Sequence, residues 1–233
     1  MDIITDYSRQ VNIFDRQKWN TEGKPISIIG AGATGSWITL ALAKMGIKNI
    51  RVYDFDDIGE HNIANQAFCV DKIGEQKVNA LQSITKDMSG ITIKTFDKEV
   101  TEKDKLNGIV FMLTDSMKSR REIFDNVIAK SPYIDLLIET RMDLRCGRIY
   151  AIKPSIIPMM EKYRESFYDD TEAEVSACGT SQTVISTAMG ISAHAIWKFL
   201  NYVNKKEFMG ETLIDFENNY IIENKWDEVG DVY

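Results

Sequence analysis

A glycine-rich turn between a predicted strand and a predicted helix constrains the fold of this chain more than any other feature. Gly30-Ala-Gly32-Ala-Thr-Gly35 follows the apolar run 26–29 and leads into small and apolar residues at helical spacing, 33–45. In such a G-x-G-x-x-G turn the first glycine permits the sharp bend, the second lets backbone N–H groups approach a phosphate, and the third allows close helix–strand packing. The turn therefore predicts a βαβ unit that binds a nucleotide through its phosphates.

The next predicted strand supports a nucleotide site. Residues 50–53 form a second predicted strand that ends at Asp54, nineteen positions after Gly35. A carboxylate at this place in a βαβ unit accepts hydrogen bonds from ribose hydroxyls. The glycines alone would also fit a plain tight turn, but together with Asp54 they predict an adenosine-type nucleotide. These residues do not separate ATP from a dinucleotide.

Predicted strands and helices alternate over the first 140 residues. This alternation predicts an α/β fold with a Rossmann-like, doubly wound, mostly parallel sheet, helices on both faces, and ligands beyond the carboxyl ends of the strands. The elements expected after the first βαβ unit are a helix at 75–88, strands at 91–96 and 108–113, a helix at 117–130 and a strand at 133–138.

The length of 233 residues fits a single domain. Within it we expect a nucleotide-binding core, 1–140, and a C-terminal extension that forms a substrate-side region, 141–233. A polar crossover segment at about 154–180, with weak periodicity, is expected to be a long connection able to cover a site. The other elements expected in this region are a strand within 144–152, a long helix at 181–204, and two short strands at 212–216 and 220–222 joined by Asn218-Asn219.

Charge and composition narrow the classes of partner. The formal net charge of −7 makes nucleic acid an unlikely partner, since proteins bind it through Lys and Arg. No apolar run approaches the roughly 20 residues of a membrane helix, and the N-terminus lacks the pattern of a secretory signal. The three cysteines, Cys69, Cys146 and Cys178, form no Cys-x-x-Cys pair, so no structural zinc is expected. We expect a soluble, cytoplasmic protein without membrane contact.

Further polar segments recur at characteristic distances from the glycine turn. In order and spacing they resemble the ThiF and MoeB adenylyltransferases and the adenylation domains of ubiquitin-activating enzymes, from Tyr7 to about Asn204. The segments that carry the resemblance are Tyr7-Ser-Arg9-Gln, Asp54-Phe-Asp56-Asp, Asn62-Ile-Ala-Asn65-Gln66, Gly74-Glu-Gln-Lys77 and Thr114-Asp115-Ser116.

The resemblance implies an ATP-dependent adenylyltransferase with ATP and Mg²⁺ as cofactors. Its substrate would be a carboxylate, namely the C-terminus of a ubiquitin-like or sulfur-carrier protein, which becomes an acyl-adenylate as pyrophosphate is released. A homodimer is also implied, and so is a separate conjugating or acceptor protein that takes the activated acyl group.

Individual roles follow from the same resemblance. Arg9 would reach the ATP phosphates of the partner subunit, Asn62 and Lys77 would contact phosphate, and Asp115 would hold Mg²⁺ as the metal ligand. Two cations and an amide placed in this way stabilise charge on the α-phosphate. The expected catalytic residues are Arg9, Asn62, Lys77, Asp115 and Cys178, and the expected nucleotide-binding residues are Gly30, Gly32, Gly35, Asp54, Asp56, Asn62, Lys77 and Asp115.

The sequence departs from the family pattern at three places. The second arginine of the N-x-x-R-Q segment is Asn65, so one phosphate-neutralising charge is missing unless Arg120, Arg121 or Arg141 replaces it. The two Cys-x-x-Cys pairs that hold zinc in many relatives are absent. The asparagine that follows the metal-binding aspartate is Ser116, which keeps a hydrogen-bonding group.

Cys178 lies shortly before the predicted long helix, near the place where some relatives carry a reactive cysteine. A thiol there could accept the activated acyl group, although a lone cysteine is more often a small, inert residue. Cys146, within a predicted strand, is a weaker candidate.

Two other functions remain as alternatives. A catalytically weakened relative that binds a ubiquitin-like protein as a scaffold would tolerate the loss at Asn65. An NAD-dependent oxidoreductase would share the glycine turn and Asp54 but has no use for Lys77 and Asp115. Some family members dehydrate a modified adenosine on tRNA, and the acidic charge of this chain gives that activity no support.

Overall fold

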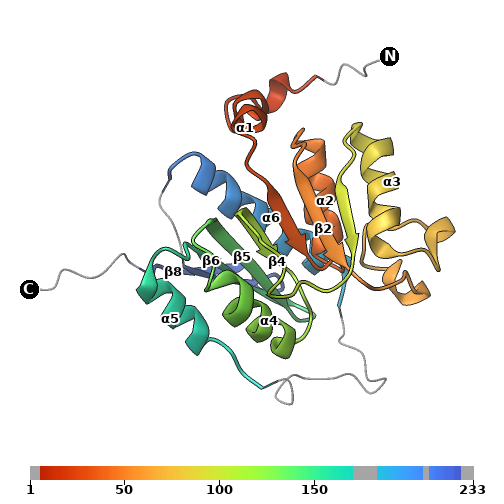
Figure 1. Ribbon diagram of the computed structural model, residues 1–233. Helices are drawn as coiled ribbons and strands as arrows, with labels where there is room; N and C mark the ends of the chain where they lie inside the picture. Colours follow the sequence, from red (N-terminus) through yellow and green to blue (C-terminus); the bar gives the residue numbers. More distant parts are fainter. Residues whose placement is uncertain (1–5, 170–182, 207–209, 227–233) are drawn as a thin grey trace, which may run out of the picture.

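The computed structural model describes residues 6–169, 183–206 and 210–226, in which one mixed sheet carries helices on both faces (Figure 1). The strand order is β3-β2-β1-β4-β5-β6-β7-β8. The strands are β1 (Ile26–Ile29), β2 (Ile50–Asp54), β3 (Lys94–Asp97), β4 (Gly108–Met112), β5 (Ile134–Met142), β6 (Cys146–Ile152), β7 (Glu211–Asp215) and β8 (Tyr220–Asn224).

The first five strands form the parallel, doubly wound part of the sheet. β1 pairs with β2 on one side and with β4 on the other, and all four residues of β1 are buried. The chain therefore reverses its direction of winding at β1, so a crevice is expected beyond the carboxyl ends of β1 and β4. The predicted α/β, Rossmann-like fold is confirmed.

The C-terminal part continues the same sheet with antiparallel strands. β5, β6, β7 and β8 pair in sequence order, and β5 turns into β6 where Asp143 Oδ1 accepts the backbone N–H groups of Arg145 and Cys146 at 2.8 and 2.7 Å. The turn from β7 to β8 contains Asn218-Asn219, and Asn219 adopts a left-handed conformation. The boundary that was expected between the nucleotide-binding core and the substrate-side region, at residue 140, thus lies inside β5.

The helices form two layers, one on each face of the sheet (Figure 1). One layer comprises α1 (Arg16–Glu22), α2 (Gly35–Lys44), α3 (Lys77–Ser89) and α6 (Ile185–Val203). The other comprises α4 (Met117–Ile123), which continues as a π-helical turn, η4 (Phe124–Ile128), and α5 (Ile157–Glu165). Single 3₁₀ turns are η1 (Ser8–Gln10), η2 (Glu60–Asn62) and η3 (Val70–Lys72).

An aromatic cluster joins the N-terminal helix to the sheet and to α6. Phe199 of α6 is fully buried and meets Trp19 of α1 edge-on, with ring centroids 5.1 Å apart. Its ring also lies 6.0 Å from that of Phe14 and 6.5 Å from that of Phe111 in β4. The segment before β1 is therefore anchored to the core by large apolar surfaces.

The expectation of a polar connection over 154–180 is wrong for its first part, which contains α5. Pro158 lies in the first turn of this helix, where its missing N–H costs nothing. Met159, Met160 and Tyr163 are buried against α4 and the sheet. Their spacing of one and four residues is helical, but the charged residues between them obscured the pattern. Residues 170–180 lie outside the described residues.

The aromatic cluster predicts a large stability difference between two positions of α6. Phe199→Ala should lower the free energy of unfolding by about 3–5 kcal/mol, because it removes a fully buried ring and leaves a cavity. Trp197→Ala on the same helix should cost only about 1 kcal/mol, since half of that side chain is already exposed. Urea unfolding of both variants measures the difference, and equal losses would contradict this account of the core.

Candidate nucleotide-binding site

The glycine turn lies directly against the end of β4. Gly30 has φ +95°, and a Cβ there would come within 2.7 Å of the carbonyl oxygen of Leu113. A Cβ on Gly35 would overlap the carbonyl oxygen of Gly30. Both glycines are therefore required by the backbone conformation and by packing within the protein.

Gly32 differs from the other two glycines. Its φ is outside the left-handed region, and among the described residues no atom beyond its two chain neighbours lies within 4 Å of the place that a Cβ would take. The fold itself therefore does not demand glycine here. Thr34 makes no side-chain hydrogen bond to cap α2, and within the first turn of this ten-residue helix the N–H of Ser36 already bonds to the carbonyl of Gly32 at 3.0 Å. Open space beside such a helix N-terminus suits a phosphate.

Asp54 is fixed beneath the turn by backbone donors. Its carboxylate accepts the N–H of Ala31 at 2.6 Å and the N–H of Asp56 at 2.9 Å. Burial raises the pKa of the Asp54 carboxyl above its ordinary value, while these hydrogen bonds and the nearby Lys77 act in the opposite direction. The side chain is therefore held at the carboxyl end of β2, beside the glycine turn.

Lys77 opens α3 and is only 7% exposed. Its ammonium group lies 2.7 Å from Asp56 Oδ2, on the segment that follows β2, and its backbone N–H bonds to the carbonyl of Asp56 at 3.0 Å. The Asp56 side chain is half exposed. Lys77 is thus the fixed member of this ion pair, and Asp56 is the member that a ligand could displace.

The loop containing Asn62 packs on the first turn of α2. Asn62 is buried, and its side-chain oxygen accepts the N–H of Gly59 at 2.9 Å. Ser36 Oγ accepts the N–H of Ala67 at 3.0 Å, and the indole N–H of Trp37 donates to the carbonyl of Asn65 at 3.0 Å. The structure therefore brings this loop beside the start of α2, next to the glycine turn.

Asp115 is exposed in the loop between β4 and α4. The two residues before it, Leu113 and Thr114, are those whose backbone touches Gly30. Ser116 follows and caps α4, since its hydroxyl accepts the N–H of Ser119 at 3.1 Å. Ser116, which stands where the family has asparagine, thus serves as the N-cap of α4.

Arg9 lies far from the glycine turn of its own chain. The next residue, Gln10, donates to the carbonyl of Met45 at 2.7 Å, and Tyr7 packs beside Gly46. These contacts are at the C-terminal end of α2, which is about 15 Å long. In Figure 1 the N-terminal segment and α1 accordingly lie at the amino ends of the parallel strands. The structure does not bring exposed Arg9 to the other site residues of its own chain.

Arg120, Arg121 and Arg141 are the candidate replacements for the arginine that is missing at Asn65, and each has another contact in the structure. Asn65 itself donates through Nδ2 to the hydroxyl of Thr183, just before α6. Arg120 and Arg141 are buried and both pair with Glu139, at 3.1 and 2.9 Å. Arg121 is exposed and lies over the ring of Phe167 at 5.5 Å.

The buried cluster around Glu139 was not expected from the sequence. Glu139 is fully buried in β5, and Tyr163 of α5 donates to its Oε2 at 2.9 Å. Burial beside Glu139 raises the pKa of the Tyr163 hydroxyl well above its ordinary value. A carboxylate and an arginine directly after the apolar residues 136–138 are the sequence signal that could have revealed the cluster, because buried charges must be paired.

The structure describes two of the three cysteines. Cys69 is exposed, and Cys146 lies at the start of β6. Desolvation raises the pKa of the Cys146 thiol, and the carboxylates of Asp143 and Asp215 add to the effect. A raised pKa reduces the thiolate that acyl transfer requires, so Cys146 is a poor acceptor. Cys178 lies outside the described residues.

The donor set around Asp115 fits magnesium better than a closed metal cage. Among the described residues, no group of three or more His, Cys, Asp or Glu side chains could hold a metal ion. Mg²⁺ bound with a nucleotide usually takes only one or two carboxylates and completes its shell with phosphates and water. Asp115 beside the glycine turn meets that requirement.

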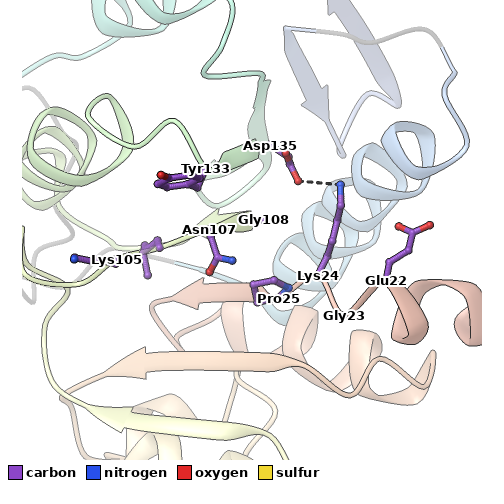
Figure 2. Close-up of a pocket in the computed structure, with 10 residues that line it drawn as sticks. Glu22, Gly23, Lys24, Pro25, Lys105, Asn107, Gly108, Tyr133 and Asp135 are labelled. Atoms are coloured by element: carbon purple, nitrogen blue, oxygen red, sulfur yellow. Dashed lines mark hydrogen bonds and ion pairs between the residues drawn. The ribbon is translucent and has the colours of Figure 1, made fainter.

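A cavity of about 480 Å³ lies at a different place (Figure 2). Its lining comes from the amino ends of β1, β4 and β5, opposite the glycine turn, and includes Tyr133, Asn107 and the pair Lys24–Asp135 at 3.0 Å. None of the expected site residues lines it. The cavity is therefore separate from the candidate nucleotide site.

Comparison with known proteins identifies the family. The sequence profile described as ThiF family matches residues 7–227, nearly the whole chain. The chain belongs to the ThiF family. The predicted family is therefore confirmed. Among curated proteins no sequence matches at a significant level.

Solved structures agree with the ThiF fold. PaaA has 16% identity and a TM-score of 0.71, with 97% of this chain and 85% of PaaA aligned. MccB from E. coli has 13% identity and a TM-score of 0.71, with 97% of this chain and 71% of MccB aligned. MccB crystallised with ATP aligns over 88% of this chain and 65% of its own, with 13% identity and a TM-score of 0.64. This ThiF chain thus spans roughly two thirds to 85% of these proteins.

In the described part of the chain, no helix has the length and apolar character needed to cross a membrane.

The glycine turn predicts opposite results for two alanine substitutions. Gly35→Ala should lower the free energy of unfolding by about 1–3 kcal/mol, because the new methyl group collides with a backbone carbonyl that cannot rotate away. Gly32→Ala should change it by no more than about 0.5 kcal/mol, since the space is open. Urea titrations of the two variants provide the comparison. A destabilised Gly32→Ala protein would show that packing, not a ligand, accounts for Gly32.

Proposed function

We propose that this ThiF-family chain binds Mg·ATP at the glycine turn and adenylates a carboxylate, the C-terminus of a ubiquitin-like or sulfur-carrier protein. The observation that carries the proposal is the convergence of Asp54, Lys77 and Asp115 on the glycine turn at the carboxyl ends of β2, β1 and β4. An NAD-dependent oxidoreductase would need the turn and Asp54 only. Lys77 and Asp115 favour a triphosphate with a metal ion.

Each of these residues has a task in the proposed reaction. The N–H groups around Gly32 and the amide Nδ2 of Asn62 donate to phosphate oxygens, while Asp54 accepts from the ribose hydroxyls. Lys77 leaves Asp56 to neutralise phosphate charge, and Asp115 is the protein ligand of Mg²⁺. ATP supplies an α-phosphate with pyrophosphate as leaving group.

The bonds made and broken balance without an oxidant or reductant. A carboxylate oxygen of the substrate forms a bond to the α-phosphorus, and the bond from that phosphorus to the bridging oxygen of the β-phosphate breaks. The products are an acyl-adenylate and pyrophosphate. Lys77 and the turn N–H groups stabilise the charge that accumulates on the α-phosphate oxygens.

Solved structures of similar proteins support a nucleotide and a second ligand in this fold. E. coli MccB has been crystallised with ATP, and the microcin C7 biosynthetic enzyme MccB with N-formylated MccA. We therefore assign the substrate side to residues 141–233 and the nucleotide to residues 1–140, the two sharing one sheet. An acceptor that receives the acyl group, either Cys178 or a separate conjugating protein, acts after adenylation.

One observation favours a second candidate function. Asn65 stands where the family has an arginine and instead bonds the hydroxyl of Thr183, while Arg120 and Arg141 are paired with Glu139. A chain that binds nucleotide and a ubiquitin-like protein but adenylates poorly would fit this loss of charge. Such a chain would be a scaffold.

The proposed function predicts the response of ATP affinity to two substitutions. Asp115→Ala and Lys77→Ala should each weaken Mg·ATP binding by at least about tenfold, because each removes a charged contact to phosphate or metal worth about 1.5–3 kcal/mol. Asp115 is exposed and Asp56 stays half solvated without Lys77, so both variants should fold. Calorimetric titration measures the affinities, with NAD titrated separately.

The outcomes separate the three functions. Mg·ATP binding with pyrophosphate exchange that depends on a protein C-terminus supports the adenylyltransferase. Mg·ATP binding without exchange supports the scaffold. Saturable NAD binding, or ATP binding that is indifferent to both substitutions, would exclude the proposed site.

The position of Arg9 predicts that two subunits complete one site. Arg9 lies at the far end of α2 from its own glycine turn, so it is suited to serve a partner's nucleotide. Mixing inactive Arg9→Ala and Asp115→Ala chains should restore about a quarter of wild-type exchange activity, because some mixed dimers contain one intact site. A sample that contains only Arg9→Ala chains provides the control. Absence of restoration would contradict a site shared between subunits.

A further inference from the structure

Arg120 is a buried arginine on α4 whose position connects two strand ends. It is 6% exposed, and its Nη2 donates to the carbonyl of Thr114, after β4, and to the carbonyl of Thr140, in β5, at 3.1 Å. Its Nε lies 3.1 Å from Glu139 Oε1 without making a hydrogen bond. The guanidinium group therefore donates its hydrogen bonds to backbone carbonyl oxygens.

The charge of Arg120 is not what keeps Glu139 buried. Arg141 binds the same carboxylate, with Nε 2.9 Å from Oε1 and Nη2 3.2 Å from Oε2, and Tyr163 donates a further hydrogen bond at 2.9 Å. One cation and one hydroxyl already compensate Glu139. The second arginine has another task.

The carbonyl that Arg120 binds immediately precedes Asp115. The same segment lies so close to Gly30 that an added Cβ there would come within 2.7 Å of the carbonyl oxygen of Leu113 and 3.2 Å of the backbone nitrogen of Thr114. The hydroxyl of Thr114 is buried and has no hydrogen-bond partner. The loop that presents Asp115 is thus confined between the glycine turn and the Arg120 guanidinium.

The same network reaches the start of α2 and α6. Thr140 Oγ1 lies 3.1 Å from Thr34 Oγ1, in the glycine turn, and Ser192 Oγ of α6 donates to the carbonyl of Thr34 at 3.2 Å. Arg120 therefore fixes the Asp115 loop relative to the turn whose N–H groups face the phosphates. A planar guanidinium can hold two carbonyls and lie beside a carboxylate at once, which the single ammonium nitrogen of lysine does not reproduce.

We propose that Arg120 is a positioning residue for Mg²⁺: by clamping the Thr114 carbonyl, it places the Asp115 carboxylate where it meets the metal on phosphates bound at the glycine turn. The inference rests on the proposed function and adds a residue that touches neither nucleotide nor metal. It also explains why Arg120 does not replace the arginine missing at Asn65.

The test measures how much Mg²⁺ strengthens ATP binding. ATP is titrated into the full chain by calorimetry, once with excess Mg²⁺ and once with EDTA, and the ratio of the two dissociation constants is the metal contribution. Arg120→Lys keeps the buried charge but loses the planar set of N–H donors that the guanidinium group provides. It should reduce this ratio by about 10- to 100-fold, as loss of an outer-shell partner typically does, while the EDTA affinity stays within about twofold of wild type.

Controls distinguish positioning from a general structural role. Arg121→Lys, the same substitution at the exposed neighbouring position of α4, should leave the ratio unchanged. In Asp115→Asn, adding Arg120→Lys should cause no further loss, because the clamp acts only through Asp115. Arg120→Gln takes the place of Arg120→Lys if circular dichroism shows that the lysine variant is unfolded, and the same reduction is expected.

The outcomes separate this inference from the function on which it rests. A wild-type ratio in the folded Arg120 variant, or equal losses with and without Asp115, would overturn the positioning role alone. A wild-type chain that does not bind ATP, or binds it without any effect of Mg²⁺, would overturn the proposed function together with the inference.

Discussion

The backbone contact between Gly30 and the end of β4 is the constraint on which the rest of the site depends. Gly30 can adopt φ +95° and approach the Leu113 carbonyl only because it lacks a Cβ, and Gly35 lies equally close to the carbonyl of Gly30. The contact sets the first turn of α2 against the sheet. It also determines where the loop with Asp115 leaves β4, so this loop begins directly beside the glycine turn.

The strand order converts this local contact into a site. β1 lies between β2 and β4, so the loops after these three strands meet at one edge of the sheet. Asp54 is the last residue of β2, and Asp115 lies in the loop after β4. Hydrogen bonds to the backbone fix polar groups at this edge. The Asp54 carboxylate, for example, accepts two backbone N–H groups. Rigid placement of this kind is what electrostatic stabilisation of a phosphate requires.

Prediction from sequence succeeded where local signals and chain order agree. The glycine turn, the alternation of strands and helices, and the motif spacing gave the fold and the ThiF family. Prediction missed α5, whose three buried side chains are interrupted by charged residues. It also left Arg120, Arg121 and Arg141 open as replacements for the missing phosphate-binding arginine, although Arg120 and Arg141 are paired with Glu139 in the interior.

The sequence by itself determined the glycine turn, the residue types at the positions proposed to contact phosphate and metal, and the departure at Asn65, because these depend on residues close together in the chain. The tertiary structure alone decided that Lys77 pairs with Asp56, that Arg9 lies at the far end of α2, and that Arg120 clamps the loop before Asp115. Those contacts join residues whose separation in sequence carries no information on distance, since only the packed sheet and helices bring their side chains together.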